Sequence, residues 1–281
     1  MTATFFALGA IALWSLLATL GLMLSHVPPF LLTGLGLLIG SIPAWPLARQ
    51  WRVPRSTLAL GIYGLFGFHF LLFIALRHAP PVTANLVNYL WPLFIVVLAP
   101  LFLRDLRWSL VHVGAALVGF AGAALAVLAD TGAADQGPNG TGGDFAWGYV
   151  AALASAWVWA SYSLLTKRVA HFPTSAIGLF GLVSGVLSLL CHVWLEPAVS
   201  LTLRDAGLLA LLGLGPLGAA FFLWDAALKR GDPRRIGVLS YLTPLASTLL
   251  LVGTSGRPLT PAIGIAALLI VGAAGVGLAA R

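Results

Sequence analysis

Long apolar runs, separated by short polar linkers, follow one another along the whole chain. Ten runs are about 17 to 25 residues long, which is the length that an α-helix needs to cross the hydrocarbon core of a bilayer. They lie near residues 4–24, 29–48, 57–76, 81–103, 108–128, 145–166, 174–194, 206–228, 236–252 and 259–280. The pattern predicts an all-α integral membrane protein with ten transmembrane helices.

The chain contains an internal repeat. Residues 60–93 recur at residues 212–245 without a gap, at a constant offset of 152. We therefore expect a first five-helix repeat over residues 1–128, a Gly- and Asp-containing linker over 129–144, and a second repeat over 145–281. Because five is odd, the second copy must enter the membrane in the opposite orientation. Such inverted repeats are typical of transporters.

Charge gives the orientation. Only 8% of the residues are charged and 60% are hydrophobic, which excludes an ordinary soluble domain. With the N-terminus inside, three of the 15 basic residues fall outside, namely Arg77, Arg204 and Arg257, and the other twelve fall inside. This bias predicts an N-in, C-in topology with a periplasmic linker. The net charge of +7 is thus a topology signal, and we expect the lipid bilayer, and no nucleic acid, as a partner.

Polar residues inside the fourth and ninth spans are the first candidates for a substrate site. Asn85, Asn88, Tyr89 and Pro92 have the i, i+3, i+4, i+7 spacing of one helix face, and Ser240, Tyr241 and Pro244 are their counterparts in the ninth span. Polar side chains are costly in hydrocarbon, so this face is expected to line a cavity. The prolines should kink the helices and free the carbonyls of Asn88 and Ser240 for a substrate ammonium. The alternative is that these groups join helices by hydrogen bonds.

Three further spans contribute candidates. Trp14 and Trp159 lie well inside the first and sixth spans, away from the interface where Trp is usually found, and Ser155 shares the face of Trp159. His69 lies in the middle of the third span. We expect these residues to face the same cavity, whereas helix packing and a neutral His bonded to a neighbouring helix are the alternatives. Asp225 is explained by i, i+4 pairing with Lys229.

Several motifs are absent from the sequence, and their absence excludes some functions. No acidic residue lies near the predicted membrane midplane, there is no nucleotide-binding loop, and no Cys/His cluster is present. We therefore expect no enzymatic activity, no cofactor and no metal, and no obligatory proton relay through a carboxylate.

The Asn88-Tyr89-Leu90-Trp91-Pro92 segment, Trp14 and the long linker resemble the drug/metabolite transporter superfamily, EamA type, and within it the YddG-like aromatic amino acid exporters. The resemblance implies helices arranged as a basket around a central cavity in the bacterial inner membrane. It also implies export of aromatic and other large neutral amino acids by alternating access. The alternative is a multidrug exporter, although the small multidrug members carry a membrane-embedded Glu in the first helix that this chain lacks. The oligomeric state is open, and a monomer is compatible with the sequence.

Overall fold

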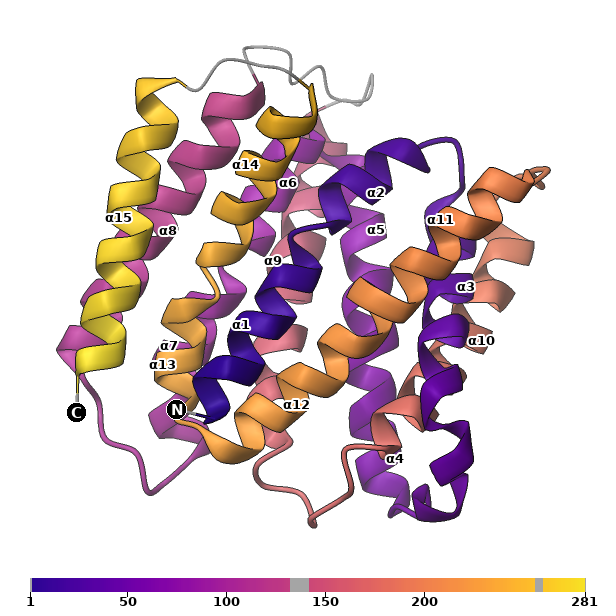
Figure 1. The fold of residues 1–281 in the computed structure, drawn as a ribbon, viewed down its shortest axis with the longest axis horizontal. Helices are drawn as coiled ribbons and strands as arrows, with labels where there is room; N and C mark the ends of the chain where they lie inside the picture. Colours follow the sequence, from indigo (N-terminus) through magenta and orange to yellow (C-terminus); the bar gives the residue numbers. More distant parts are fainter. Residues whose placement is uncertain (1, 132–141, 256–259, 281) are drawn as a thin grey trace.

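The computed structural model describes residues 2–131, 142–255 and 260–280, and this part of the chain contains helices and no strand (Figure 1). The first half forms α1 (Thr2–Trp14), α2 (Leu17–Met23), α3 (Pro29–Ser41), α4 (Arg55–Ile62), α5 (Phe68–His78), α6 (Pro81–Asn88), α7 (Trp91–Phe102) and α8 (Leu110–Thr131). The second half forms α9 (Gly142–Leu165), α10 (Ala176–Leu195), α11 (Leu203–Leu214), α12 (Ala220–Arg230), α13 (Pro233–Leu239), α14 (Leu242–Ser255) and α15 (Pro261–Ala279).

Nine helical segments within the described residues are long and apolar enough to cross a membrane. They are Thr2–Met23, Pro29–Gln50, Arg55–His78, Pro81–Phe102, Leu110–Leu128, Ala146–Leu165, Ala176–Leu195, Leu203–Arg230 and Pro261–Ala279. Helices α13 and α14 cover the remaining expected span, 236–252. Helices α8 and α9 extend into the expected linker, and residues 132–141 of that linker lie outside the described residues.

Several expected spans are interrupted. The first breaks between α1 and α2 at Ser15 and Leu16, and the second continues beyond α3 as a 3-10 helix, Ile42–Gln50. The third and eighth each contain a π-helical turn, Tyr63–Gly67 between α4 and α5 and Gly215–Ala219 between α11 and α12. Such wide turns leave backbone carbonyls free for other partners and are frequent at functional sites.

The fourth and ninth spans also differ from expectation. A kink inside one continuous helix was expected at each proline, but the helix ends and a new one begins. Pro92 lies in the first turn of α7 and Pro244 in the first turn of α14. A proline is tolerated there because the first N–H groups of a helix have no partner within it. The breaks also interrupt the single helix face on which the polar residues were placed.

These interruptions recur at the spacing of the sequence repeat. The two π-helical turns, the bounds of α5 and α12, and the starts of α6 and α13 are each 152 residues apart. Packing recurs as well, because α1 packs on α12 as α5 packs on α9. The pairs α3 with α10 and α8 with α15 each lie side by side (Figure 1). The same local structure and the same neighbours therefore appear in both halves.

Helices α3 and α10 approach closely, and a Cβ on Gly185 would lie 2.9 Å from the carbonyl oxygen of Gly34. Glu196, just beyond α10, holds the start of α3. Its fully buried carboxylate accepts the backbone N–H of Phe30 at 2.9 Å and contacts Arg77 of α5 at 3.0 Å. This charge-assisted network fixes the ends of three helices to one another.

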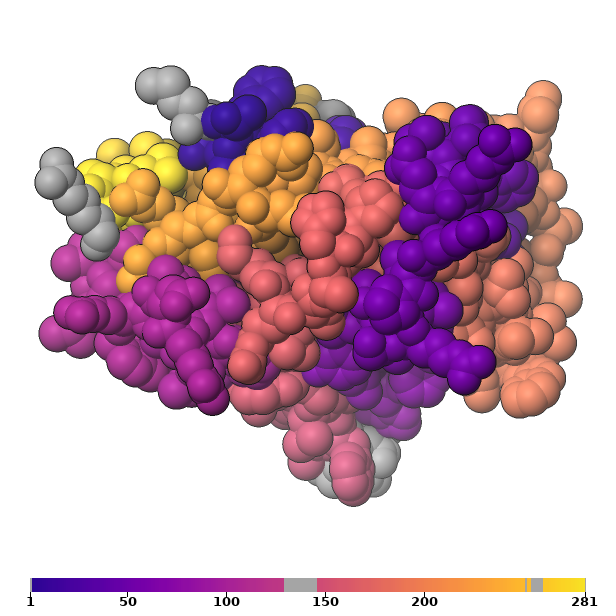
Figure 2. Space-filling view, turned by 90° about the horizontal axis from the view of Figure 1, so that it is seen from below, coloured from indigo at the N-terminus to yellow at the C-terminus, as the bar shows by residue number. Residues whose placement is uncertain are grey.

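Helix α1 begins and α15 ends at the same end of the bundle, here called the terminal end (Figure 1). Figure 2 looks onto this end, where the segments after α7 and α9, the turn after α12 and the 3-10 helix after α3 come to the surface. Many of the basic residues lie in these segments or just beyond them: Arg49, Arg52, Arg104, Arg107, Lys167, Arg168, Arg234 and Arg235.

Candidate functional site

Five aromatic residues from four helices meet inside the bundle and form the central aromatic cluster: Trp14 (α1), Trp91 (α7), Trp159 (α9), Phe221 and Trp224 (α12). All five are buried. The ring centroids of Trp14 and Trp159 are 5.8 Å apart, and those of Trp14 and Trp224 are 5.2 Å apart. Aromatic rings at such distances attract one another beyond the burial of their surface. Trp14 and Trp159 are therefore brought together, in contact with each other.

Two indole N–H groups of this cluster, those of Trp14 and Trp224, have hydrogen-bond partners. Trp14 donates to the carbonyl oxygen of Pro216 at 3.1 Å, within the π-helical turn between α11 and α12. Trp224 donates to the hydroxyl oxygen of Ser163 at 3.1 Å. A buried indole needs such a partner, and the wide turn supplies a carbonyl that a regular helix would use internally. Trp14, the last residue of α1 before the break, is thus hydrogen-bonded to the π-helical turn.

His69 lies next to the cluster, at 6.2 Å between its ring centroid and that of Phe221. Its Nδ1 is 2.6 Å from the carbonyl oxygen of Leu65, in the other π-helical turn. The alternative of a bond to a neighbouring helix is therefore wrong, since the partner is on its own span. A carbonyl only accepts, so Nδ1 carries the proton. Nε2 has no hydrogen-bond partner among the described residues, and in a neutral ring it is an acceptor.

Asn88 and Ser155 meet across two helices. The Ser155 hydroxyl donates to Oδ1 of Asn88 at 2.8 Å, and both side chains are buried. Asn85 and Tyr89 lie one turn apart, and both residues are only partly buried. The bond between Asn88 and Ser155 joins two helices, which was the alternative to lining a cavity. Asn85 and Tyr89, in contrast, keep accessible surface.

Ser240 and Tyr241 are placed elsewhere. Tyr241 is fully buried in a separate cluster, where its ring lies against Gly119 and at 6.4 Å from the ring of Phe120 in α8. The Ser240 hydroxyl donates to the carbonyl oxygen of Ile236 at 2.7 Å. The Ser240 carbonyl was expected to be free, which is wrong: it accepts the N–H of Thr243 at 3.0 Å. A turn at the break brings the Thr243 N–H to the Ser240 carbonyl. Pro244 has no N–H and could not bond to this carbonyl.

Sequence reasoning missed Trp91, Phe221 and Trp224. Trp91 and Trp224 lie inside their spans, so the criterion that selected Trp14 would also have selected them. Phe221 gave no such signal, because phenylalanine is common on every face of a membrane helix. The pairing of Asp225 with Lys229 is confirmed at 2.6 Å, and Thr174 donates to the same carboxylate oxygen.

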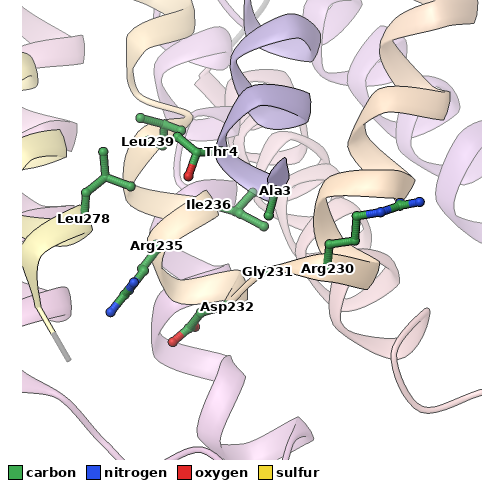
Figure 3. Close-up of a pocket in the computed structure, with 9 residues that line it drawn as sticks. All are labelled: Ala3, Thr4, Arg230, Gly231, Asp232, Arg235, Ile236, Leu239 and Leu278. Carbon is green, nitrogen blue, oxygen red and sulfur yellow. The ribbon is translucent and has the colours of Figure 1, made fainter. Parts of the chain in front are cut away.

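Two pockets of the described structure lie away from the central aromatic cluster. One, of about 210 Å³, is at the terminal end between the starts of α1 and α13 (Figure 3). Its two arginines, Arg230 and Arg235, point their guanidinium groups away from one another (Figure 3). It therefore offers no convergent pair of charges for an anion. The other is an apolar groove between α8 and α15.

The fold is typical of a membrane carrier, with helical spans, repeated breaks and a central aromatic cluster. Comparison with known proteins gives its family. The family model described as the EamA-like transporter family matches residues 1–128 and 146–278, and the chain belongs to this family. The resemblance found in the sequence is thereby confirmed.

Three similar proteins are informative. The Aromatic amino acid exporter YddG of Ancylobacter novellus is 43% identical over 282 aligned residues, which cover 98% of this chain and 96% of that protein. The Uncharacterized inner membrane transporter YhbE of Escherichia coli is 28% identical over 75% of this chain and 65% of that protein. One solved crystal structure, of a protein 41% identical in sequence, has a TM-score of 0.91 and covers 100% of this chain and 99% of its own.

Proposed function

We propose that this protein exports amino acids with aromatic or large neutral side chains across the bacterial inner membrane by alternating access. The observation that carries the proposal is the 43% identity, over 98% of the chain, to a protein named as an aromatic amino acid exporter. The central aromatic cluster supports it, since aromatic faces hold large apolar side chains and attract an ammonium group. The protein then acts as a carrier and not as an enzyme.

The proposed architecture is ten transmembrane helices in two inverted five-helix repeats, with both termini in the cytoplasm. Three observations support it: local structure recurs at an offset of 152, α1 begins where α15 ends, and basic segments gather at that end. The repeats cover residues 1–128 and 145–281, and residues 129–144 are the periplasmic linker. The terminal end then faces the cytoplasm.

This topology is tested by labelling a single cysteine. In a Cys191→Ser background, an Arg281→Cys variant should resist a membrane-impermeant thiol reagent in intact cells and react after permeabilisation. A cysteine in place of Asn139, in the linker, is the positive control and should react in both. Labelling of position 281 in intact cells would refute the topology.

The proposed substrate site is built from Trp14 and Trp159 with His69, together with Asn85, Asn88, Tyr89 and Ser155. The indole faces take the side chain, and the amide, hydroxyl and imidazole groups take the zwitterion. A bare Nε2 on His69 suits an ammonium, because no acidic side chain interacts with this histidine within the described structure. Ser240 and Tyr241 support the α13–α14 break from the packed side. The breaks at Pro92 and Pro244 are hinges where repeats rock against one another.

Counter-flow in proteoliposomes tests the substrate class. Labelled phenylalanine should exchange with unlabelled phenylalanine even when the pH gradient is collapsed, because no carboxylate relay is available. Trp159→Ala should reduce the exchange at least about tenfold, the effect of losing about 1.4 kcal/mol of binding. Trp157→Ala is the matched control, since that Trp is 45% exposed on the same helix.

Two outcomes would contradict the proposal. If exchange vanishes without a pH gradient, transport is proton-coupled. If a quaternary ammonium dye exchanges and phenylalanine does not, the multidrug alternative takes its place.

A further inference from the structure

An apolar groove runs along the outer side of the α8–α15 pair, near the terminal end. Its volume is about 380 Å³, and all its lining residues are apolar: Leu110, Val111, Gly114, Ala115, Val118, Leu268, Leu269, Gly272, Ala273 and Val276. The walls face outward, with Leu110 88% and Leu268 76% exposed. The groove is therefore a feature of the surface that the proposed function places in the membrane.

The floor of the groove is open space. A Cβ on Gly114 or Gly272 would meet no atom within 4 Å. On the inner side of the same pair the helices touch, since a Cβ on Gly122 would lie 2.8 Å from the Ile270 side chain. The two helices thus pack along one side and leave a channel along the other.

Positive charge gathers where the groove meets the terminal end. Arg104 and Arg107 lie in the exposed segment just before α8, beside Trp108, which is 56% exposed. Arg235 donates from Nη2 to the Ala280 carbonyl, just beyond the end of α15. Two acidic groups are nearby: Asp105 is exposed in the same segment, and Asp232 is held by Arg234 at 2.7 Å. The net charge at this end of the groove is therefore positive.

We infer that this groove holds one acyl chain of an anionic phospholipid whose phosphate lies against Arg107 and Arg235. The inference goes beyond the transported substrate, but it rests on the proposed membrane orientation. An acyl chain gains little binding free energy by moving from the surrounding lipid into the groove, because both are apolar. The groove therefore only accommodates the chain, and the headgroup determines which lipid binds. Each arginine near an anionic headgroup favours it about fivefold. Trp108 marks the headgroup level.

Native mass spectrometry of the detergent-purified protein tests the inference. The protein is offered equal amounts of phosphatidylglycerol and phosphatidylcholine with the same acyl chains. The wild type should retain one phosphatidylglycerol in preference to phosphatidylcholine. Arg107→Gln should lower that preference about fivefold. Gly272→Leu should reduce retention of both lipids, because the new side chain occupies the floor.

Gly264→Leu is the matched control. Gly264 is exposed on the same helix, a Cβ there meets no atom within 4 Å, and it lies outside the groove. It should retain lipid as the wild type does. Gly114→Leu, on the opposite helix, provides a second groove variant if Gly272→Leu does not fold.

Three results would overturn the inference. They are equal retention of both lipids by the wild type, equal effects of Gly264→Leu and Gly272→Leu, and a wild-type dimer that Gly272→Leu converts to a monomer. The last would assign the groove to a second copy of the chain. Phenylalanine counter-flow is measured on the same preparations, so a failure of the lipid site and a failure of the proposed transport are distinguishable.

Discussion

The break between α6 and α7 and the break between α13 and α14 have the same backbone plan but different surroundings. Both helix pairs start with a proline, break at a tyrosine and resume with a proline in the first turn. Around the first break, Asn88 bonds to Ser155 of α9, and Trp91 joins the central aromatic cluster. Around the second, Ser240 bonds within its own helix, and Tyr241 is packed against α8.

The tyrosines show the difference most clearly. Tyr241 is fully buried and its ring lies on Gly119, whereas Tyr89 is only partly buried. Gly119 begins a Gly-x-x-Gly pattern in α8 that recurs in α15 from Gly272, at an offset of 153, and nothing lies within 4 Å of a Cβ built on Gly272. Tyr241 is therefore packed between helices, whereas Tyr89 at the equivalent break keeps accessible surface. The backbone break therefore recurs in both halves, while the side chains around it have different partners.

The largest expected effect is on stability, from truncating the packed tyrosine. Tyr241→Ala should lower the free energy of unfolding by about 3 to 5 kcal/mol, as for large aromatic residues in cores. Tyr89→Ala should cost clearly less, because Tyr89 is partly exposed. Thermal unfolding in detergent compares the two. Equal loss for both variants would show that the second tyrosine is not specially packed.

The sequence predicted the helical class and most spans, because apolar length is a local property of the chain, and the local structure recurs at the 152-residue offset of the sequence match. It did not predict the π-helical turns or the break after Trp14. These depend on partners distant in sequence, such as Pro216, whose carbonyl accepts the Trp14 N–H. Gly64, covered by the ring of Tyr162, is the residue that could have indicated a close approach there.

The second expected effect comes from adding one methyl group at the first glycine of each Gly-x-x-Gly pattern, in α8 and in α15. Gly119→Ala places a Cβ 2.6 Å from ring carbon Cδ2 of Tyr241, so the ring or the helix must shift. Overpacking of this kind costs about 1 to 3 kcal/mol. Gly272→Ala meets open space and should leave the unfolding temperature unchanged or slightly higher, since alanine favours helix. If both variants unfold alike, the asymmetry between the two halves is absent.

The candidate site was predicted less completely than the fold. Trp14, Trp159 and His69 were selected by depth in their spans, and the structure brings them together. Tyr241 was selected by analogy with Tyr89, and the analogy failed because the neighbour of each tyrosine differs. A repeat in sequence fixes the backbone better than it fixes which partner a side chain meets.

The smallest expected effect separates the two polar residues at the breaks by transport rather than by stability. Asn88→Ala removes one of the two acceptors that share the Ser155 hydroxyl proton and one group of the proposed site, and the hydroxyl can then donate to the Ala152 carbonyl alone, at 2.7 Å. A lost hydrogen bond of about 1 to 1.5 kcal/mol corresponds to about a tenfold slower phenylalanine exchange if the bond acts in the transport cycle. Ser240→Ala should leave exchange nearly unchanged, because its hydroxyl only repeats a contact within α13. Counter-flow rates, corrected for the amount of inserted protein, give the comparison. Equal rates for Asn88→Ala and the wild type would place Asn88 among the packing groups, beside Ser240, and would leave Asn85 and Tyr89 as the polar contacts of the fourth span.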